Sequence, residues 1–455
     1  MRTRSGAGRA FVMAGLALLL ALLWPAPTAG QAAESLTVNL AARTRPATHV
    51  GEGFLYGISQ DASLPANQFL QPLGVNAFRG AGHASRGWIG DNYTFGTGAR
   101  ADITEAITQA RHLSGAQYQV ILSDVYGADG GQPSNTMWPC DGGSCANYVS
   151  FLDSVVGALQ ASGLKFAYDV WNEPDISVFW ARGMNSAQYF QMWDTGVREI
   201  RRIAPGATIV GPSVAITPQQ SPSEWQTWLA HVKGAGTLPN EISNHLEGDG
   251  DDPVTVAPAI NADFSSNGIA PIALSANEFG PRDQQTAGQS AWYLARLAQS
   301  RYANAMRGNW VCCETPNLTG LLTQSGSTWL ATGIWWTFRS YADLTGSLVS
   351  TSGQVGSTAI SAAEDSSARR AVAIVGDDGS FTGAASVTFG GLSSVSFLAN
   401  NGSIHVTVDR IPDQAPLSAP QVVLSRNMST SSGSFTVPLT FQAAHDAFAI
   451  YLTRP

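Results

Sequence analysis

The sequence predicts an α/β fold, a (β/α)8 TIM barrel with an accessory antiparallel β-sandwich domain. From about Phe54 to Phe338, short apolar runs alternate with segments whose apolar residues recur at helical spacing, a pattern typical of βαβ units. After about Gly346 the helical spacing ends, and short alternating runs typical of strands, Val395–Ala399 among them, are separated by Gly, Ser, Asn and Asp. With 455 residues, the chain is long enough for a barrel and a smaller second domain.

The barrel region contains eight candidate strands, the number that a closed parallel barrel requires. They are Phe54–Ser59, Val75–Arg79, Gln117–Ser123, Lys165–Trp171, Thr208–Pro212, Glu241–His245, Pro271–Asn277 and Thr332–Phe338. The spacing of apolar residues predicts helices between them at Asp102–Leu113, Tyr148–Ala161, Ala187–Ile203, Ser221–Val232 and Gln285–Met306.

The chain divides into four segments by composition. Residues 1–33 have a basic start, an apolar core too short for a lasting membrane span and then small residues, which is typical of a secretory signal peptide. Residues 34–50 carry the alternating run Ser35–Leu40, which we expect to add a strand to the β-sandwich. Residues 51–345 form the predicted barrel and residues 346–455 the predicted sandwich. We therefore expect a secreted protein with no membrane segment in its mature form.

Charge and cysteine content narrow the class of protein. A formal net charge of -8 argues against nucleic acid or an anionic membrane as a partner. Cys140 and Cys145 flank a short flexible loop, so a local disulfide is expected in an oxidising compartment. The adjacent Cys312 and Cys313 could form a strained vicinal bridge, remain thiols or pair elsewhere. The spacings do not resemble a zinc site.

Two carboxylates follow candidate strands four and seven. The run Ala167–Trp171 is largely apolar, and Pro174 cannot donate to a strand ladder, so Glu173 should lie where the fourth strand ends. The apolar run Pro271–Asn277 leads directly into Glu278. Catalytic residues of parallel barrels lie at the carboxyl ends of the strands, and a pair of carboxyl groups there fits glycoside hydrolysis.

The longer pattern resembles glycoside hydrolase family 39. The resemblance rests on Val170-Trp-Asn-Glu-Pro-Asp175 with Phe179-Trp180 and Tyr189, and on Arg201-Arg-Ile-Ala-Pro-Gly-Ala-Thr-Ile-Val-Gly-Pro-Ser213. That family belongs to a clan of retaining (β/α)8 glycosidases and includes β-xylosidases, α-L-iduronidases and exopolysaccharide glycosidases. The resemblance is dense over residues 165–213 and thinner elsewhere. Phe279-Gly280 departs from the tryptophan that often follows the family's nucleophile.

The resemblance implies a role for five residues of this chain. Glu173 would be the acid/base and Glu278 the nucleophile, while Asn172 would hydrogen-bond the sugar 2-hydroxyl. Arg79, at the end of the second strand, would keep Glu278 ionised, and His245 would line the sugar subsite. The alternatives are a structural ion pair for Arg79 and a core position for His245.

Two further features bear on the ligand. Trp335 and Trp336 fall in the predicted eighth strand, where an aromatic ring can form a platform for a sugar, but alternation lets only one of them face it. The acidic run Glu247–Asp252 could bind calcium or be an ordinary solvated loop. No dinucleotide, phosphate or haem motif is present, so no metal and no organic cofactor is expected.

The sequence thus predicts a secreted retaining glycoside hydrolase that acts on an oligosaccharide or polysaccharide. We expect exo-action on xylosides, arabinosides or related plant or microbial glycans. One alternative is an endo-acting relative that cleaves an exopolysaccharide or cell-wall glycan. The other is a barrel that binds carbohydrate without cleaving it.

Overall fold

The computed structural model describes residues 33–82, 97–128, 137–311, 315–353 and 356–455. The predicted signal peptide therefore lies almost wholly outside the described residues, as do Cys312 and Cys313. The expected bond between Cys140 and Cys145 is present. Among the described helices, none combines the length and the apolar character needed to cross a membrane.

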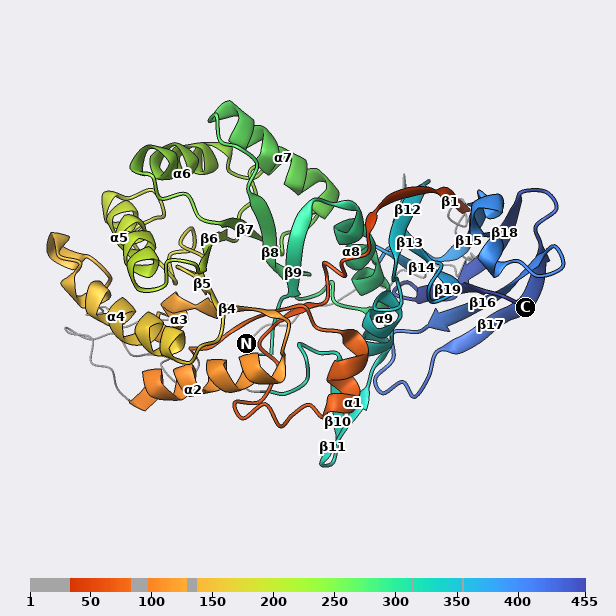
Figure 1. Ribbon diagram of the computed structural model, residues 1–455, viewed down its shortest axis with the longest axis horizontal. Helices are drawn as coiled ribbons and strands as arrows, with labels where there is room; N and C mark the ends of the chain where they lie inside the picture. The colour runs from red at the N-terminus through yellow and green to blue at the C-terminus, as the bar shows by residue number, and fades with distance from the viewer. Residues whose placement is uncertain (1–32, 83–96, 129–136, 312–314, 354–355) are drawn as a thin grey trace, which may run out of the picture.

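Eight parallel strands close into a barrel, with helices packed around them (Figure 1). The strands are β2 (Gly53–Leu55), β3 (Ala77–Gly80), β4 (Gln117–Ile121), β5 (Ala167–Asp169), β6 (Thr208–Val214), β7 (Glu241–Leu246), β8 (Ala273–Phe279) and β9 (Tyr302–Arg307). The described helices that belong to this part are α1 (Asn67–Leu70), α2 (Thr97–His112), α3 (Leu122–Tyr126), α4 (Ala146–Ala161), α5 (Ala187–Ile203), α6 (Pro222–Ala235), α7 (Pro253–Ser266), α8 (Ala287–Gln299) and α9 (Gly333–Tyr341).

The prediction for the eighth strand was wrong. Thr332–Phe338 is not a strand: Thr332 caps the N-terminus of helix α9, its side chain accepting a hydrogen bond from the Trp335 amide. The strand that closes the barrel is β9, which the sequence pattern had assigned to the end of one long helix. Helix α8 ends at Gln299, because Ser300 adopts an extended conformation. The Ala and Met residues of β9 continue the apolar spacing of α8, which hid the change of structure.

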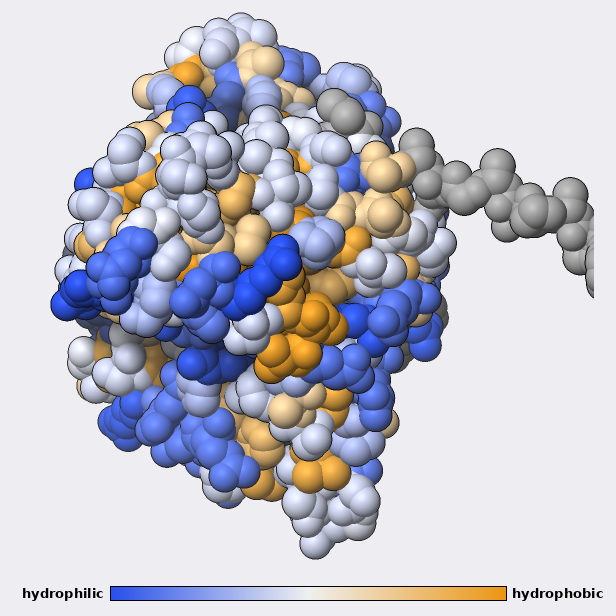
Figure 2. Space-filling view, turned by 90° about the vertical axis from the view of Figure 1, so that its right-hand side faces the viewer, coloured by the Kyte–Doolittle hydropathy of each residue, from blue (hydrophilic) through white to orange (hydrophobic). Residues whose placement is uncertain are grey.

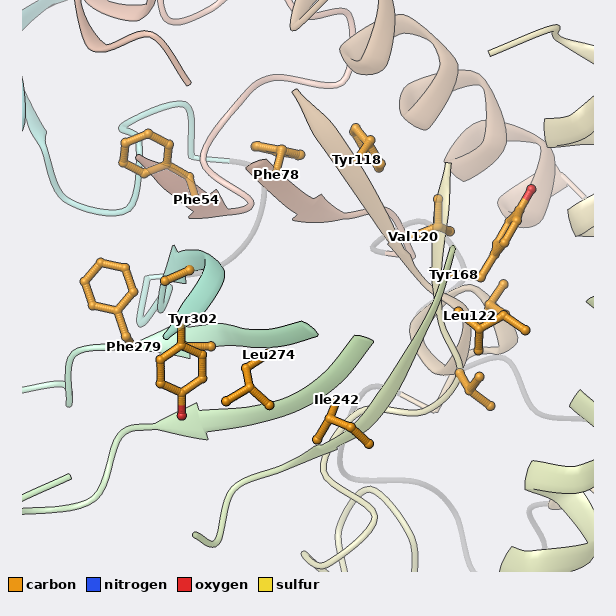
Figure 3. Close-up of a cluster of buried hydrophobic side chains, with 14 of the residues drawn as sticks. Phe54, Phe78, Tyr118, Val120, Leu122, Tyr168, Ile242, Leu274, Phe279 and Tyr302 are labelled. Atoms are coloured by element: carbon orange, nitrogen blue, oxygen red, sulfur yellow. The ribbon is translucent and has the colours of Figure 1, made fainter. Parts of the chain in front are cut away.

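The barrel strands alternate between apolar side chains that face the helices and polar ones that face the interior. Figure 3 shows the apolar set, among them Phe78, Tyr118 and Tyr168. The residues next to them in each strand point into the barrel. Part of the barrel interior is filled by a hydrogen-bonded network instead of aliphatic layers. That network consists of Gln117, Gln119, Glu241, Ser275 and Asn304. Polar groups joined in this way help to hold the strand ends above them in one arrangement.

The second domain is a nine-stranded, mostly antiparallel sheet in the order β17-β16-β19-β14-β13-β12-β1-β15-β18. Its strands are β1 (Glu34–Pro46), β12 (Ser347–Ser352), β13 (Thr358–Asp365), β14 (Arg370–Asp377), β15 (Gly383–Gly390), β16 (Ser403–Ile411), β17 (Gln421–Ser429), β18 (Ser434–Phe441) and β19 (Ala447–Thr453). One apolar core joins side chains from both ends of this sheet, so the sheet folds over itself as a sandwich. The run Val395–Ala399, expected to be a strand, lies mostly in a 3-10 helix (Leu392–Leu398).

Helix α8 joins the two domains. The Gly288 amide donates to the His445 carbonyl, and the Gln299 side chain donates to the Ile360 carbonyl in β13. A Cβ at Gly376 in β14 would collide with the backbone of α8, so helix and sheet lie in direct contact there. The β domain therefore packs on the same helix that follows the barrel strand carrying Glu278.

The end of the molecule formed by the β domain is mostly hydrophilic, with one compact apolar patch near the centre of the view (Figure 2). Strand β17, at one edge of the sheet, carries the exposed side chains Val422 and Val423.

Candidate active site

The two carboxylates predicted from the sequence meet at the mouth of the barrel. Glu278 lies on β8, the seventh barrel strand, and Glu173 lies in the loop after β5, the fourth. Strand β5 ends at Asp169, earlier than predicted, and the chain then continues as a loop to Glu173. The two side chains are only 13% and 11% exposed. Both are therefore largely shielded from solvent, which strengthens electrostatic interactions between them and their neighbours.

Arg79, at the centre of this site, is fully buried and contacts three of its polar groups. Its Nη1 donates to Glu278 Oε1 at 2.6 Å, and its Nη2 donates to Asn172 Oδ1 at 2.7 Å. Asp169 accepts from both Nε and Nη2 of the same guanidinium. Burial alone would lower the pKa of Arg79, but the charges of Asp169 and Glu278 outweigh it and raise the pKa. Arg79 therefore remains a cation beside Glu278.

Asp169 lies in the apolar run that precedes Glu173 and was not predicted from the sequence as a site residue. Its Oδ1 accepts from Ser213 Oγ at 2.7 Å, and its Oδ2 accepts from Asn277 Nδ2 at 3.1 Å as well as from Arg79. Side chains from three other barrel strands thus converge on one carboxylate. The signal that could have revealed it is an acidic residue at an inward-facing position of an otherwise apolar strand.

His245, on β7, lies between the two carboxylates. Its Nδ1 is 3.2 Å from Glu173 Oε1, and its Nε2 is 3.6 Å from Glu278 Oε1. The ring is fully buried, and this burial lowers its pKa despite the opposing charge of Glu278. A neutral imidazole thus spans the gap between the two carboxyl groups. The sequence left a sugar-subsite position and a core position open for His245; its ring is buried and lies close to both carboxyl groups.

The backbone around Glu173 is strained and anchored. Glu173 has a φ of 44°, in the left-handed region that non-glycine residues rarely adopt. Its amide donates to the Ser213 carbonyl at 2.9 Å. Two residues on, Asp175 accepts from the amides of Ala215 and Ile216, which ties this loop to the segment after β6. These contacts hold the Glu173 carboxyl group toward the barrel axis.

One of Trp335 and Trp336 was predicted to form a sugar platform at the end of a strand, but neither lies on a barrel strand. Both are on helix α9: the Trp335 indole donates to the Phe69 carbonyl, and the Trp336 indole donates to the Leu417 carbonyl. Their rings pack edge to face against each other. The error has the same cause as the misplaced strand, because the platform was inferred from a strand that is a helix. Their contacts are those of residues that pack the barrel against the β domain.

The aromatic residue that does follow the eighth barrel strand is Trp310. It is 40% exposed, and its indole nitrogen donates at 3.1 Å to the carbonyl of Gly280, two residues after Glu278. Correct assignment of β9 would have identified this residue from the sequence, since it comes three residues after Arg307. An exposed ring fixed beside the mouth can stack on the apolar face of a sugar.

The acidic run after β7 is not a solvated loop throughout. Asp251 accepts from the Gly248 amide, and Asp252 caps helix α7 and pairs with Arg296. These two carboxylates therefore already bind groups of the protein. Glu247 behaves differently, because its side chain turns inward to His245.

Solved structures with this architecture include several glycoside hydrolases. The protein N2152 from Neocallimastix frontalis matches with a TM-score of 0.77 and 24% identity, over 93% of this chain and 100% of that one. The GH39 enzyme from Xanthomonas axonopodis pv. citri matches at 0.64 and 14%, over 95% and 100%. A monomeric β-xylosidase from Caulobacter crescentus CB15 matches at 0.62 and 15%, over 93% and 100%.

The chain shares their fold. No protein-family model matches its sequence, and no curated protein does so either. The structural similarity covers the barrel and the β domain together. At 14–24% sequence identity it is evidence for the fold alone. What the site can do chemically follows from its own groups. These are the carboxyl groups of Glu173 and Glu278, the cation of Arg79 beside Glu278, and the imidazole of His245 between the two carboxyl groups.

Proposed function

We propose that the protein is a retaining glycoside hydrolase in which Glu173 is the acid/base and Glu278 the nucleophile. The observation that carries the proposal is the arrangement around His245, where a single buried ring contacts carboxyl groups from barrel strands four and seven. Glu278 is bound by the buried cation Arg79. A carboxylate held ionised in this way suits the group that attacks, with Glu173 as the group that delivers the proton.

The reaction then has two steps. Glu278 attacks the anomeric carbon while Glu173 gives its proton to the departing glycosidic oxygen, which forms a glycosyl-enzyme and frees the first product. Glu173 next takes a proton from water, whose oxygen attacks the same carbon and releases Glu278. Arg79 holds the Asn172 oxygen, which leaves the amide nitrogen of Asn172 as the donor for a sugar hydroxyl.

For the substrate we propose neutral pentosides of plant or microbial glycans, xylosides or arabinosides, cleaved from a chain end. Support comes from the fold shared with a β-xylosidase and from the carboxylate-rich mouth, which disfavours an anionic sugar. Secretion, inferred from residues 1–33, is part of the same proposal.

Azide rescue tests the two assignments separately. With an activated aryl glycoside, Glu278→Ala should lose turnover by about 10⁴-fold or more and regain cleavage with azide, giving a glycosyl azide of inverted configuration. Glu173→Ala should form the glycosyl-enzyme and give an azide product of retained configuration. Glu199→Ala, on the outer helix α5, is the control and should behave as the unchanged protein. Full activity of Glu278→Ala without azide would refute the proposal.

A further inference from the structure

Glu247 brings a third carboxyl group to the proposed catalytic pair. It follows directly after β7, two residues beyond His245, and its side chain is 10% exposed. Its Oε2 lies 3.8 Å from His245 Nδ1. Glu173, His245 and Glu247 each place an atom within 4.8 Å of the other two. Glu247 is thus part of the same cluster and not of the surface loop that follows it.

The structure accommodates this side chain in a specific way. A Cβ at Gly308, just after β9, would collide with Glu247 Oε1, so the glycine leaves the space that the carboxyl group occupies. The same oxygen is buried, and no described residue hydrogen-bonds to it. A charged carboxylate with a bare buried oxygen would be costly, whereas a neutral carboxyl group needs less solvation.

The charges that face Glu247 also favour the neutral form. Glu278 on β8 and Glu173 in the loop after β5 are acidic, and Tyr293 on α8 and His245 carry no positive charge at neutral pH. Among the described residues, the cation that acts on the group is Arg79, which already pairs with Asp169 and Glu278. Burial, followed by the charges of Glu278 and Glu173 and by a side-chain hydrogen bond between Glu247 and Glu278, raises the pKa of Glu247 well above the usual range.

We propose that Glu247 is a positioning residue of the active site that works in its protonated form, donating a hydrogen bond to the nucleophile Glu278. The proposal rests on the function proposed above. During the second step, the bond between the anomeric carbon and Glu278 breaks and its electron pair remains on the Glu278 carboxylate. The proton of the attacking water goes to Glu173. Glu247 keeps its proton throughout, and its hydrogen bond strengthens as the negative charge returns to Glu278.

Three variants test this role. In Glu247→Ala the donor is lost, and because a hydrogen bond to a charged group contributes about 1.5–3 kcal/mol, kcat should fall about 10- to 150-fold. Slower release of the sugar should let the glycosyl-enzyme accumulate, which intact-protein mass spectrometry detects. Glu247→Gln retains an N–H donor at the same place and should restore most of the rate. Asp249→Asn removes a charge from the exposed part of the same loop and serves as the matched control.

The pH profile gives a readout that a purely structural role would not alter. As pH rises, Glu247 loses its proton and a third negative charge appears beside Glu173 and Glu278, so kcat/KM should fall with two ionisations on the alkaline side. Glu247→Gln cannot ionise and should show one ionisation. The proposal is overturned if the Gln variant is as slow as the Ala variant, if the Ala variant keeps the full rate, or if the two pH profiles coincide. Azide rescue of Glu278→Ala is independent of these outcomes, so failure here leaves the proposed function standing.

Discussion

The Nε and Nη2 atoms of Arg79 both donate to Oδ2 of Asp169, at 2.8 and 2.6 Å, and neither side chain has any exposure to solvent. This pair lies directly beside Glu278, so the second carboxylate shares a cation that is already fixed in place. The orientation of the nucleophile is thereby coupled to the stability of the barrel.

Replacing Arg79 should therefore damage both stability and activity. Arg79→Met leaves two buried carboxylates without their cation, which should cost about 3–5 kcal/mol in the free energy of unfolding. Urea denaturation measures this loss. Arg202→Met breaks only surface ion pairs and should leave the urea midpoint nearly unchanged. Equal midpoints for the two variants would show that the Arg79 network does not stabilise the barrel.

Trp310 should contribute to substrate binding and little to folding. Removing a stacked ring costs about 0.5–1.5 kcal/mol, so Trp310→Ala should raise KM about 2- to 10-fold, while Trp310→Phe should restore part of the binding. Since the side chain is 40% exposed, the thermal midpoint should change little. The neighbouring Val311→Ala, at a residue 61% exposed, is the control. An unchanged KM in Trp310→Ala would exclude the platform role.

Trp335 should show the opposite behaviour. Its ring is buried, with its indole bonded to the Phe69 carbonyl, so Trp335→Ala should lower the free energy of unfolding by about 3–5 kcal/mol. At a temperature where the variant remains folded, its KM should match that of the unchanged protein. Chemical denaturation and steady-state kinetics on one preparation measure the free energy of unfolding and KM. A raised KM with an unchanged free energy of unfolding would instead show that Trp335 contacts the sugar.

The buried carboxyl group of Glu247 should make stability depend on pH. Its pKa in the folded protein is raised above the ordinary value of 4.5, so the folded state holds a proton that the unfolded chain has lost. The stabilising contribution of Glu247 is complete below that value and is lost as pH rises toward the folded pKa, by about 1.4 kcal/mol per pH unit. Glu247→Gln has no such proton. Urea unfolding of both proteins from pH 4.5 to 8 should therefore give a difference that grows with pH, and a constant difference would contradict a buried neutral acid.

Seven of the eight barrel strands could be predicted from the sequence, because short apolar runs bounded by Gly, Pro and polar residues mark them. The same reasoning found Glu173 and Glu278, since each follows such a run. Strand β9 was missed because Ala and Met suit helices and strands alike, and its polar Asn304 belongs to an interior network that depends on three other strands, β4, β7 and β8. Tertiary contacts decided its structure.

Glu247 shows where sequence reasoning about the site stops. In the chain it begins an acidic run, and nothing in composition separates it from Asp249, whose side chain faces solvent. The difference arises because Glu247, just after β7, points toward a space that Gly308 leaves open. Gly308 follows β9 and is distant from Glu247 in sequence. Only the folded barrel brings these two positions together.

Strand β1 has a consequence for how the protein is assembled. It is the first described element, yet it lies inside the nine-stranded sheet, antiparallel to β12 and parallel to β15, with the whole barrel between it and those partners along the chain. During synthesis, β1 cannot pair with β12 and β15 until the barrel has been made, because both strands follow the barrel in the chain. The β domain is therefore not a module that can be cut away or exchanged at one boundary, and a graft onto another barrel would need both of its segments.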